Sequence, residues 1–152
     1  MKKLSVLLLV AAVFAAGAYE NSAAALKAGN AFRSKKQNKE AIAAYDEALK
    51  LSKNNSEKYV ICFYSGISSA GLKDYDAAIS KIRESLQYTQ NGNNLSSSQY
   101  HIAHYLGIQK KYDQAIAEMS KVKELSKGNS FFQKKIGIVL TPVYRRRRQF
   151  LT

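Results

Sequence analysis

The sequence predicts an all-α protein made of three helix hairpins, which recur along the chain, and one further helix near the C-terminal end. Apolar residues return every three or four positions, which is the period of a helix with one buried face. The dipeptide Ala-Ile begins at Ala41, Ala78 and Ala115, so two equal intervals of 37 residues separate its copies. Among 152 residues there is one proline, Pro142, and almost nothing interrupts helix formation.

The first 18 residues are typical of a secretory signal peptide. Lys2 and Lys3 precede an uncharged run from Leu4 to Tyr19, and this run closes on the small residues 16–18. Its 16 residues are fewer than the roughly 20 that a membrane-spanning helix needs. We therefore expect cleavage after Ala18 and export to the periplasm or the medium. The alternative is an uncleaved segment that tethers the protein to a membrane.

Each hairpin is expected to hold two helices joined by a short link. The first helices are predicted at about residues 23–34, 58–70 and 97–109. The links are predicted at 35–38, 71–74 and 110–111. Each second helix carries an apolar stripe, formed by Ile42, Tyr45 and Leu49, by Ile79, Ile82 and Leu86, and by Ile116, Met119 and Val122. Asp74 is well placed to cap the helix that follows it, because its carboxylate can accept an unpaired backbone N–H.

A seventh helix is predicted over residues 131–144, where it would cover the open end of the stack. Its apolar face would hold Ile136, Val139, Leu140 and Val143, and Pro142 would kink or end it. The predicted organisation is therefore a signal peptide at 1–18, three repeats within 19–130 (about 22–55, 59–92 and 96–129), and a capping helix with a basic tail at 131–152. A competing interpretation is a longer array cut within a fourth copy.

The repeats resemble the tetratricopeptide repeat. The first copy carries that family's small and aromatic signature at Ala25, Ala28, Gly29, Phe32, Ala41, Tyr45 and Ala48. The period of 37 residues exceeds the family's 34, and we expect the additional residues in the turns between copies. The resemblance implies a right-handed superhelix whose first helices line a concave groove for a peptide or a neighbouring protein.

The resemblance places seven residues in this groove: Leu26, Asn30, Arg33, Phe63, Ile67, Tyr100 and His104. Phe63 and Tyr100 have an alternative interpretation as partly buried packing residues, because aromatic stripes are usually core. The Lys/Asn clamp with which some relatives seize a C-terminal carboxylate is incomplete, since Leu26 and Ser97 stand where lysines are expected. We therefore do not predict capture of a chain terminus.

A basic segment follows the repeats. The chain has a formal charge of +13, and seven of its basic residues lie between Leu125 and Thr152 with no acidic residue among them. Arg145, Arg146, Arg147 and Arg148 would suit the anionic headgroups of a membrane surface, where each basic residue contributes about 1 kcal/mol. Nucleic acid phosphates attract the same cluster, but export argues against that partner. The alternative is a solvated tail without a partner.

Catalysis is not predicted. Neither histidine has a nucleophile and a third member beside it, and His101 with His104 lacks the further ligands of a metal site. The lone Cys62 takes a buried packing position and is expected to be inert. The sequence thus predicts a non-catalytic interaction module or scaffold that binds protein or peptide, without cofactor, metal or small-molecule substrate. The alternative is a membrane-surface adaptor acting through the basic tail.

Overall fold

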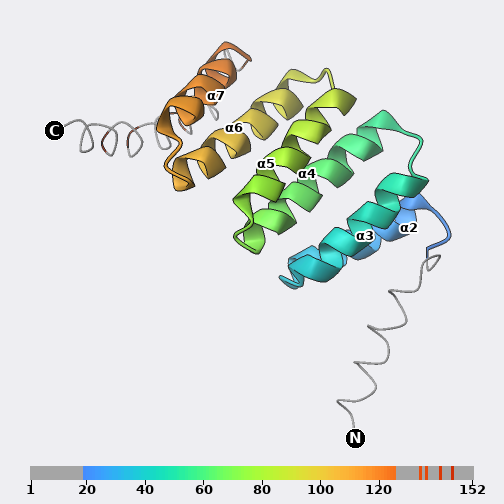
Figure 1. Cartoon of the computed structure of the whole chain (residues 1–152). Helices are drawn as coiled ribbons and strands as arrows, with labels where there is room; N and C mark the ends of the chain where they lie inside the picture. Colours follow the sequence, from blue (N-terminus) through green and yellow to red (C-terminus); the bar gives the residue numbers. More distant parts are fainter. Residues whose placement is uncertain (1–18, 126–133, 135, 137–140, 142–144, 146–152) are drawn as a thin grey trace, which may run out of the picture.

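The computed structural model describes residues 19–125 and four later residues, namely Lys134, Ile136, Thr141 and Arg145 (Figure 1). The predicted signal peptide lies outside the described residues. So do most of the predicted capping helix and basic tail.

Helices are the only regular secondary structure in the described part of the chain, which confirms the predicted all-α fold of tetratricopeptide type (Figure 1). Three pairs of α-helices follow one another, and no strand occurs within residues 19–125. The helices are α2 (Ser22–Ser34), α3 (Asn38–Leu51), α4 (Asn55–Gly71), α5 (Tyr75–Ser85), α6 (Gly92–Ile108) and α7 (Tyr112–Leu125), with a short 3-10 helix η1 (Leu86–Tyr88) after α5.

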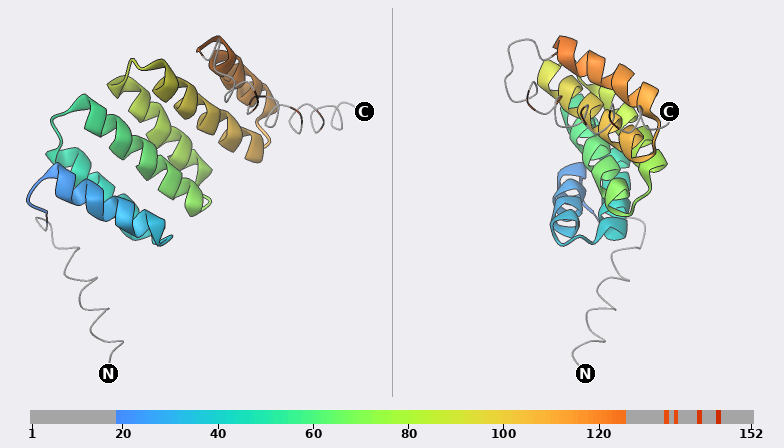
Figure 2. Two further views of the ribbon diagram at one scale, coloured as in Figure 1. Left: turned by 180° about the vertical axis from the view of Figure 1, so that it is seen from behind. Right: turned by 90° about the vertical axis from the view of Figure 1, so that its left-hand side faces the viewer.

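The pairs stack side by side in chain order. Each helix packs against the next one along the chain, and α2 also touches α4. In Figure 1 the second helix α3 lies in front of α2, and the view from behind in Figure 2 reverses that order. The first helices therefore form one layer of the stack and the second helices form the other.

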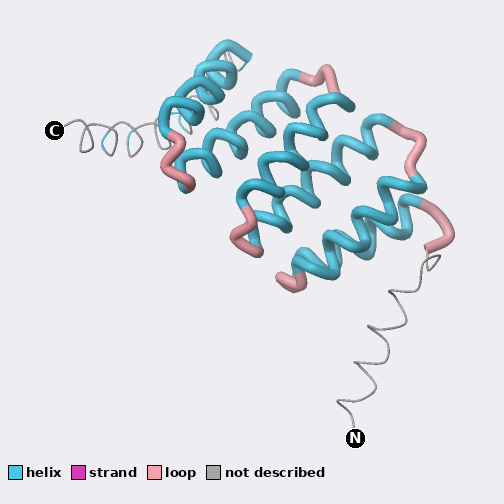
Figure 3. The backbone as a smooth tube through the Cα atoms, viewed as in Figure 1, coloured by secondary structure: helices cyan, strands magenta, loops and turns pink. Residues whose placement is uncertain are grey.

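The turns within the three pairs share one backbone conformation. Their central residues are Lys36, Lys73 and Lys110, which have positive φ angles of 59°, 64° and 62° and are spaced 37 residues apart. In each turn, the amide of the next residue bonds to a carbonyl five positions earlier, at 3.0 Å, 3.1 Å and 2.9 Å respectively. This is the Schellman closure of a helix C-terminus. All three turns lie at the same edge of the stack (Figure 3).

Asparagine and aspartate side chains cap the first turns of α4, α5 and α6. Asn54 Oδ1 accepts hydrogen bonds from the amides of Ser56 and Glu57, Asn91 caps α6 in the same way, and Asp74 accepts from Ala77, which confirms the predicted cap. Consequently α4 and α6 begin at residues 55 and 92, earlier than predicted.

The expectation that all the additional residues of the 37-residue period lie in the turns between copies holds at one link and not at the other. Six residues, 86–91, separate α5 from α6 and include η1, whereas only residues 52–54 separate α3 from α4. The helices α4 and α6 each extend over 17 residues. The caps at Asn54 and Asn91 allow the polar residues that follow them to join α4 and α6, so part of the longer period lies in these two helices.

A small residue faces a large one in each pair. A Cβ on Gly29 would lie 2.6 Å from the Tyr45 ring, and one on Gly66 would lie 2.6 Å from Ile82 Cγ1. In the third pair, the corresponding residues Ala103 and Met119 share a buried cluster with Val122 and Ile136. Ile136, predicted to face the open end of the stack, is thus buried there. Val139, Leu140 and Val143 lie outside the described residues.

Candidate functional site

A buried tyrosine fixes two polar side chains of α2. Tyr45 on α3 is fully buried, and its hydroxyl donates to Asn30 Oδ1 at 2.8 Å. The same hydroxyl accepts a hydrogen bond from Nε of Arg33 at 3.3 Å. Burial raises the pKa of Tyr45, so the phenol keeps the proton that it donates. Asn30 and Arg33, one helical turn apart, are therefore held by one anchor.

The guanidinium of Arg33 also lies over an aromatic ring. Its central carbon is 4.3 Å from the centroid of Tyr64 on α4, within the range of a cation–π interaction. No carboxylate among the described residues forms an ion pair with Arg33. This arginine is thus held by a ring and a hydroxyl rather than by an opposite charge.

Aromatic side chains continue from Tyr64 across α4 and onto α6. Phe63 lies 5.4 Å from Tyr64 and 5.4 Å from His101 between ring centroids. His101 lies 5.4 Å from Tyr100, whose ring stacks on His104 at 6.4 Å. We call these five residues the aromatic row. It joins the first helices of the second and third pairs through side chains, and Arg33 extends it to the first pair.

The structure brings most of the predicted groove residues together. Phe63, Tyr100 and His104 belong to the aromatic row, and Arg33 with Asn30 lies at its α2 end. Leu26 packs against the core cluster of the first pair, and Ile67 packs against the cluster between α5, α6 and α7. Phe63 and Tyr100 are both half-buried and touch core clusters, so they pack the interior and also present surface.

Sequence reasoning missed Tyr45 and Tyr64 as members of the site, and it considered His101 only as a surface or groove histidine without placing it among the groove residues. A signal was present, because Tyr64 and His101 are 37 residues apart and each follows a predicted groove residue. The repeat therefore has two adjacent aromatic positions rather than one, and the ring of Phe63 contacts both Tyr64 and His101. Tyr45 was assigned to the core stripe alone, and its hydroxyl could not be placed from the pattern.

Carboxylates are almost absent from the first helices. Glu57 is the only acidic residue on α2, α4 and α6, and it accepts hydrogen bonds from Ser22 and Ser52, both at 2.6 Å. These two bonds lower its pKa. The second helices hold eight of the eleven acidic residues of the chain, namely Glu40, Asp46, Glu47, Asp76, Glu84, Asp113, Glu118 and Glu124. The two layers thus differ in charge as well as in aromatic content.

The far end of the aromatic row is neutral at physiological pH. His104 is exposed, but the groups around it remove part of its solvation, which lowers its pKa below the usual 6.5. The rings of Tyr100 and Tyr105 lie 6.4 Å and 5.6 Å away. Burial raises the pKa of Tyr105 to about 12, so this neighbour carries no charge either. The two ends of the aromatic row therefore differ in charge: the His104 end is neutral, and Arg33 makes the α2 end positive.

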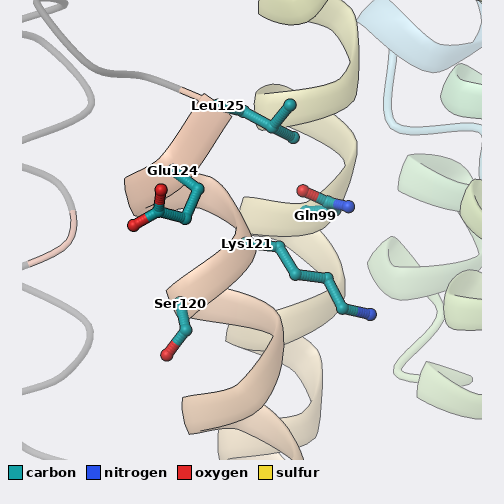
Figure 4. A pocket seen from close by; sticks show the side chains of 5 residues that line it. All are labelled: Gln99, Ser120, Lys121, Glu124 and Leu125. Carbon is teal, nitrogen blue, oxygen red and sulfur yellow. The ribbon is translucent and has the colours of Figure 1, made fainter.

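A separate hollow lies on α6 and α7. It has a volume of about 440 Å³ and is lined by Gln99 from α6 and by Ser120, Lys121, Glu124 and Leu125 from α7 (Figure 4). None of the predicted groove residues lines it. The hollow is thus distinct from the aromatic row.

The remaining predicted sites are only partly described. Arg145 is exposed, whereas Arg146, Arg147 and Arg148 lie outside the described residues. Cys62 is buried, and burial raises the pKa of its thiol to about 12, so it carries no thiolate at neutral pH. Across the described positions, no three His, Cys, Asp or Glu side chains gather closely enough to hold a metal ion. None of the described helices is long and apolar enough for a bilayer crossing.

Comparison with known proteins gives two matches to family models. A TPR repeat model matches residues 29–59, from the second half of α2 through α3 into α4. A tetratricopeptide repeat model matches residues 96–129, which begin within α6 and include α7. A search of curated proteins gave no match. Two segments of the chain therefore match tetratricopeptide repeat models, and the helix pairs have the fold of that repeat.

Proposed function

We propose that this protein is a non-catalytic scaffold that holds a peptide or protein segment on the face of its first helices. Tetratricopeptide repeats generally bind proteins or peptides. The observation that carries the proposal for this face is the aromatic row, which runs from Tyr64 to His104 without a carboxylate beside it on the same helices.

Binding on such a face needs no chemical step. The rings contact one another, and several are half-buried, so they lose little conformational freedom when a partner covers them. Aromatic rings also offer a large contact area with few rotatable bonds. An extended segment or a helix would lie along the row and exclude water from it.

Export is part of the proposal. The basic start, the apolar run and the small residues at 16–18 support a signal peptide, and we infer a role in the periplasm or outside the cell.

A second candidate function is that of an adaptor on an anionic membrane surface. The seven basic residues without an acidic residue in the last 28 positions favour it.

Site-specific cross-linking tests the main proposal. A photoreactive side chain at His104, which is exposed on the aromatic row, is expected to capture a partner in whole cells. The matched control is the same group at Lys123, which is exposed on α7 in the other layer. Equal capture at both positions, or capture at Lys123 alone, would contradict binding on the first helices.

Vesicle binding tests the adaptor. Replacing Arg145 to Arg148 by glutamine keeps the length of the tail and removes four charges. The adaptor function requires that this variant lose binding to vesicles rich in phosphatidylglycerol, with cross-linking at His104 reduced in parallel. If cross-linking at His104 is unchanged in this variant, partner binding does not depend on the basic tail, which supports the scaffold and contradicts the adaptor.

A further inference from the structure

The α2 end of the aromatic row carries unused hydrogen-bond donors. The Tyr45 hydroxyl gives its single proton to Asn30 Oδ1, which turns the Asn30 amide nitrogen away from Tyr45. Arg33 uses Nε toward the same hydroxyl, which leaves its two terminal nitrogens. Within residues 19–125, neither these terminal nitrogens nor Asn30 Nδ2 donates to a protein acceptor.

Arg33 differs in this respect from the other arginine of the described repeats. Arg83 on α5 bonds to Glu118 at 2.8 Å, so its charge is balanced within the fold. Arg33 has no carboxylate partner in the described chain, and its own layer offers only Glu57, which is bonded to Ser22 and Ser52. A fixed, unbalanced guanidinium beside a primary amide is a suitable binding site for an anion.

The anion that fits is a single carboxylate. One guanidinium presents parallel N–H groups that match the two oxygens of a carboxylate, and the Asn30 amide lies one helical turn away to donate a further bond. A phosphate dianion calls for more positive charge than one guanidinium supplies. Lys27 is the only other cation on α2, and Lys35 and Lys36 lie exposed in the turn after the helix. The rings of Tyr64 and Phe63 follow directly and suit an apolar or aromatic neighbour of that acidic residue.

We propose that Asn30 and Arg33 bind the side-chain carboxylate of an aspartate or glutamate within the partner segment, and that an adjacent apolar side chain of the partner packs on Tyr64 and Phe63. The proposal rests on the proposed function, because it names the chemistry of the segment that lies on the aromatic row. It differs from capture of a chain terminus, for which the lysines expected at Leu26 and Ser97 are missing.

Selection from a random peptide library on the full chain tests this assignment. The selected peptides are expected to share one acidic residue next to an apolar or aromatic residue. Synthetic copies with an amidated C-terminus are then measured by fluorescence anisotropy. Replacing the acidic residue by its amide is expected to weaken binding about 10- to 100-fold, the usual range for a hydrogen-bonded charge.

Variants of the protein locate the effect. Arg33→Gln is expected to weaken binding of the acidic peptide by a similar factor and to change binding of the amide peptide little. Lys27→Gln is the matched control, since it removes one positive charge from the same helix. Arg33→Lys keeps the charge without the paired N–H geometry and is expected to fall between Arg33→Gln and the unaltered protein. Thermal unfolding of each variant checks that the fold is retained.

Several outcomes would overturn the assignment. Equal losses for Lys27→Gln and Arg33→Gln would show that general charge attraction, not a site, selects the peptide. Binding that requires a free C-terminus, or that tightens tenfold when phosphoserine replaces the acidic residue, would reject the internal carboxylate. Selected peptides that depend on Phe63 but lack an acidic residue would reject this inference and leave the proposed function intact. Failure to select any peptide that depends on the aromatic row would reject both.

Discussion

At the scale of single residues, the packing of each pair depends on a small side chain opposite a large one. Gly29 faces Tyr45 and Gly66 faces Ile82, and the same two positions hold Ala103 and Met119 in the third pair. A flexible methionine side chain tolerates an alanine opposite it, whereas the tyrosine and isoleucine contacts leave no room for one. Whether the first helix carries glycine or alanine at this position therefore depends on the large side chain that faces it from the second helix.

Gly66→Ala is expected to destabilise the protein by about 1–3 kcal/mol, the usual cost of overpacking. The new Cβ would lie 2.6 Å from Ile82 Cγ1 and 2.9 Å from the carbonyl oxygen of Ala78, and a backbone atom cannot move aside easily. Urea unfolding followed by circular dichroism measures the change. Gly92→Ala is the matched control, because no atom lies within 4 Å of its added Cβ. Equal stability of the two variants would contradict the packing argument.

Because of Glu57, the free energy of unfolding of the protein is expected to depend on pH in the acid range. Hydrogen bonds from Ser22 and Ser52 lower its pKa from the ordinary 4.5. The unfolded chain therefore binds a proton more readily than the folded chain, and stability falls as the pH decreases from about 4.5 through the lower folded pKa. Glu57→Gln is expected to be less stable at pH 7, with the difference shrinking below pH 4.5. A constant difference across this range in urea titrations would contradict the account.

At the scale of elements, three lysines adopt a conformation that normally favours glycine. Lys36, Lys73 and Lys110 each close a first helix with a positive φ. At such a φ angle, a residue with a Cβ is less favourable than glycine by about 1 kcal/mol in the folded state. Glycine in turn loses more conformational entropy on folding. The repeated use of lysine shows that this turn geometry, rather than glycine itself, is the recurring feature.

Lys73→Gly is expected to leave stability unchanged or to raise it by up to about 1 kcal/mol, and Lys73→Val to lower it by about 1 kcal/mol. Valine is branched at Cβ and fits a positive φ poorly. Thermal unfolding measures both variants. Lys53→Gly, an exposed lysine in the link before α4 without a positive φ, is expected to be destabilising. Loss of stability in Lys73→Gly as large as in Lys53→Gly would contradict the role of the left-handed conformation.

The sequence predicted the elements better than their ends. Apolar periodicity located all six helices of the described repeats and the Asp74 cap. The starts of α4 and α6 were predicted late because residues 55–57 and, except for Leu95, residues 92–96 are not apolar and add little to an apolar stripe. Their helical state depends on the capping side chains of Asn54 and Asn91, which the hydrophobic pattern does not report.

The sequence predicted the residues of the candidate site on the first helices, but not the side chain that joins them from α3. The 37-residue register located Phe63, Tyr100, Arg33 and Asn30 on the first helices, where the structure joins them. The hydroxyl of Tyr45 joins two of these residues from another helix, and no spacing within α2 indicates such a contact. Hydrogen bonds between helices depend on rotamers and on the depth of burial, which appear only once the pairs are packed.

At the scale of the whole molecule, several polar contacts between successive pairs share one sequence separation. Four hydrogen bonds between elements of neighbouring pairs join residues 35 positions apart, namely Ser22 to Glu57, Tyr59 to Asn94, Arg83 to Glu118 and Lys111 to Asp76. The Lys81–Asp46 ion pair, at 3.9 Å, has the same separation. Equivalent positions recur every 37 residues, so each of these five contacts joins a residue to one that lies two positions short of its own equivalent.

Reversing the charges of one such contact tests its role in stacking. Arg83→Glu is expected to destabilise the protein by about 1 kcal/mol or more, because it places a second carboxylate beside Glu118, which is only 6% exposed. Adding Glu118→Arg is expected to restore part of the loss. A double-mutant cycle in urea provides the coupling energy. Additive effects of the two changes would show that the pair contributes nothing to stacking.

These contacts also specify the order in which the pairs can follow one another. Asp46 and Arg83 occupy equivalent positions of successive copies, as do Lys81 and Glu118, yet the sign of the charge changes from copy to copy. Exchanging the second and third copies would place Glu118 beside Asp46, and two carboxylates would repel. A shuffled gene would therefore encode intact hairpins that assemble poorly, because the units are alike in backbone and unlike in polarity.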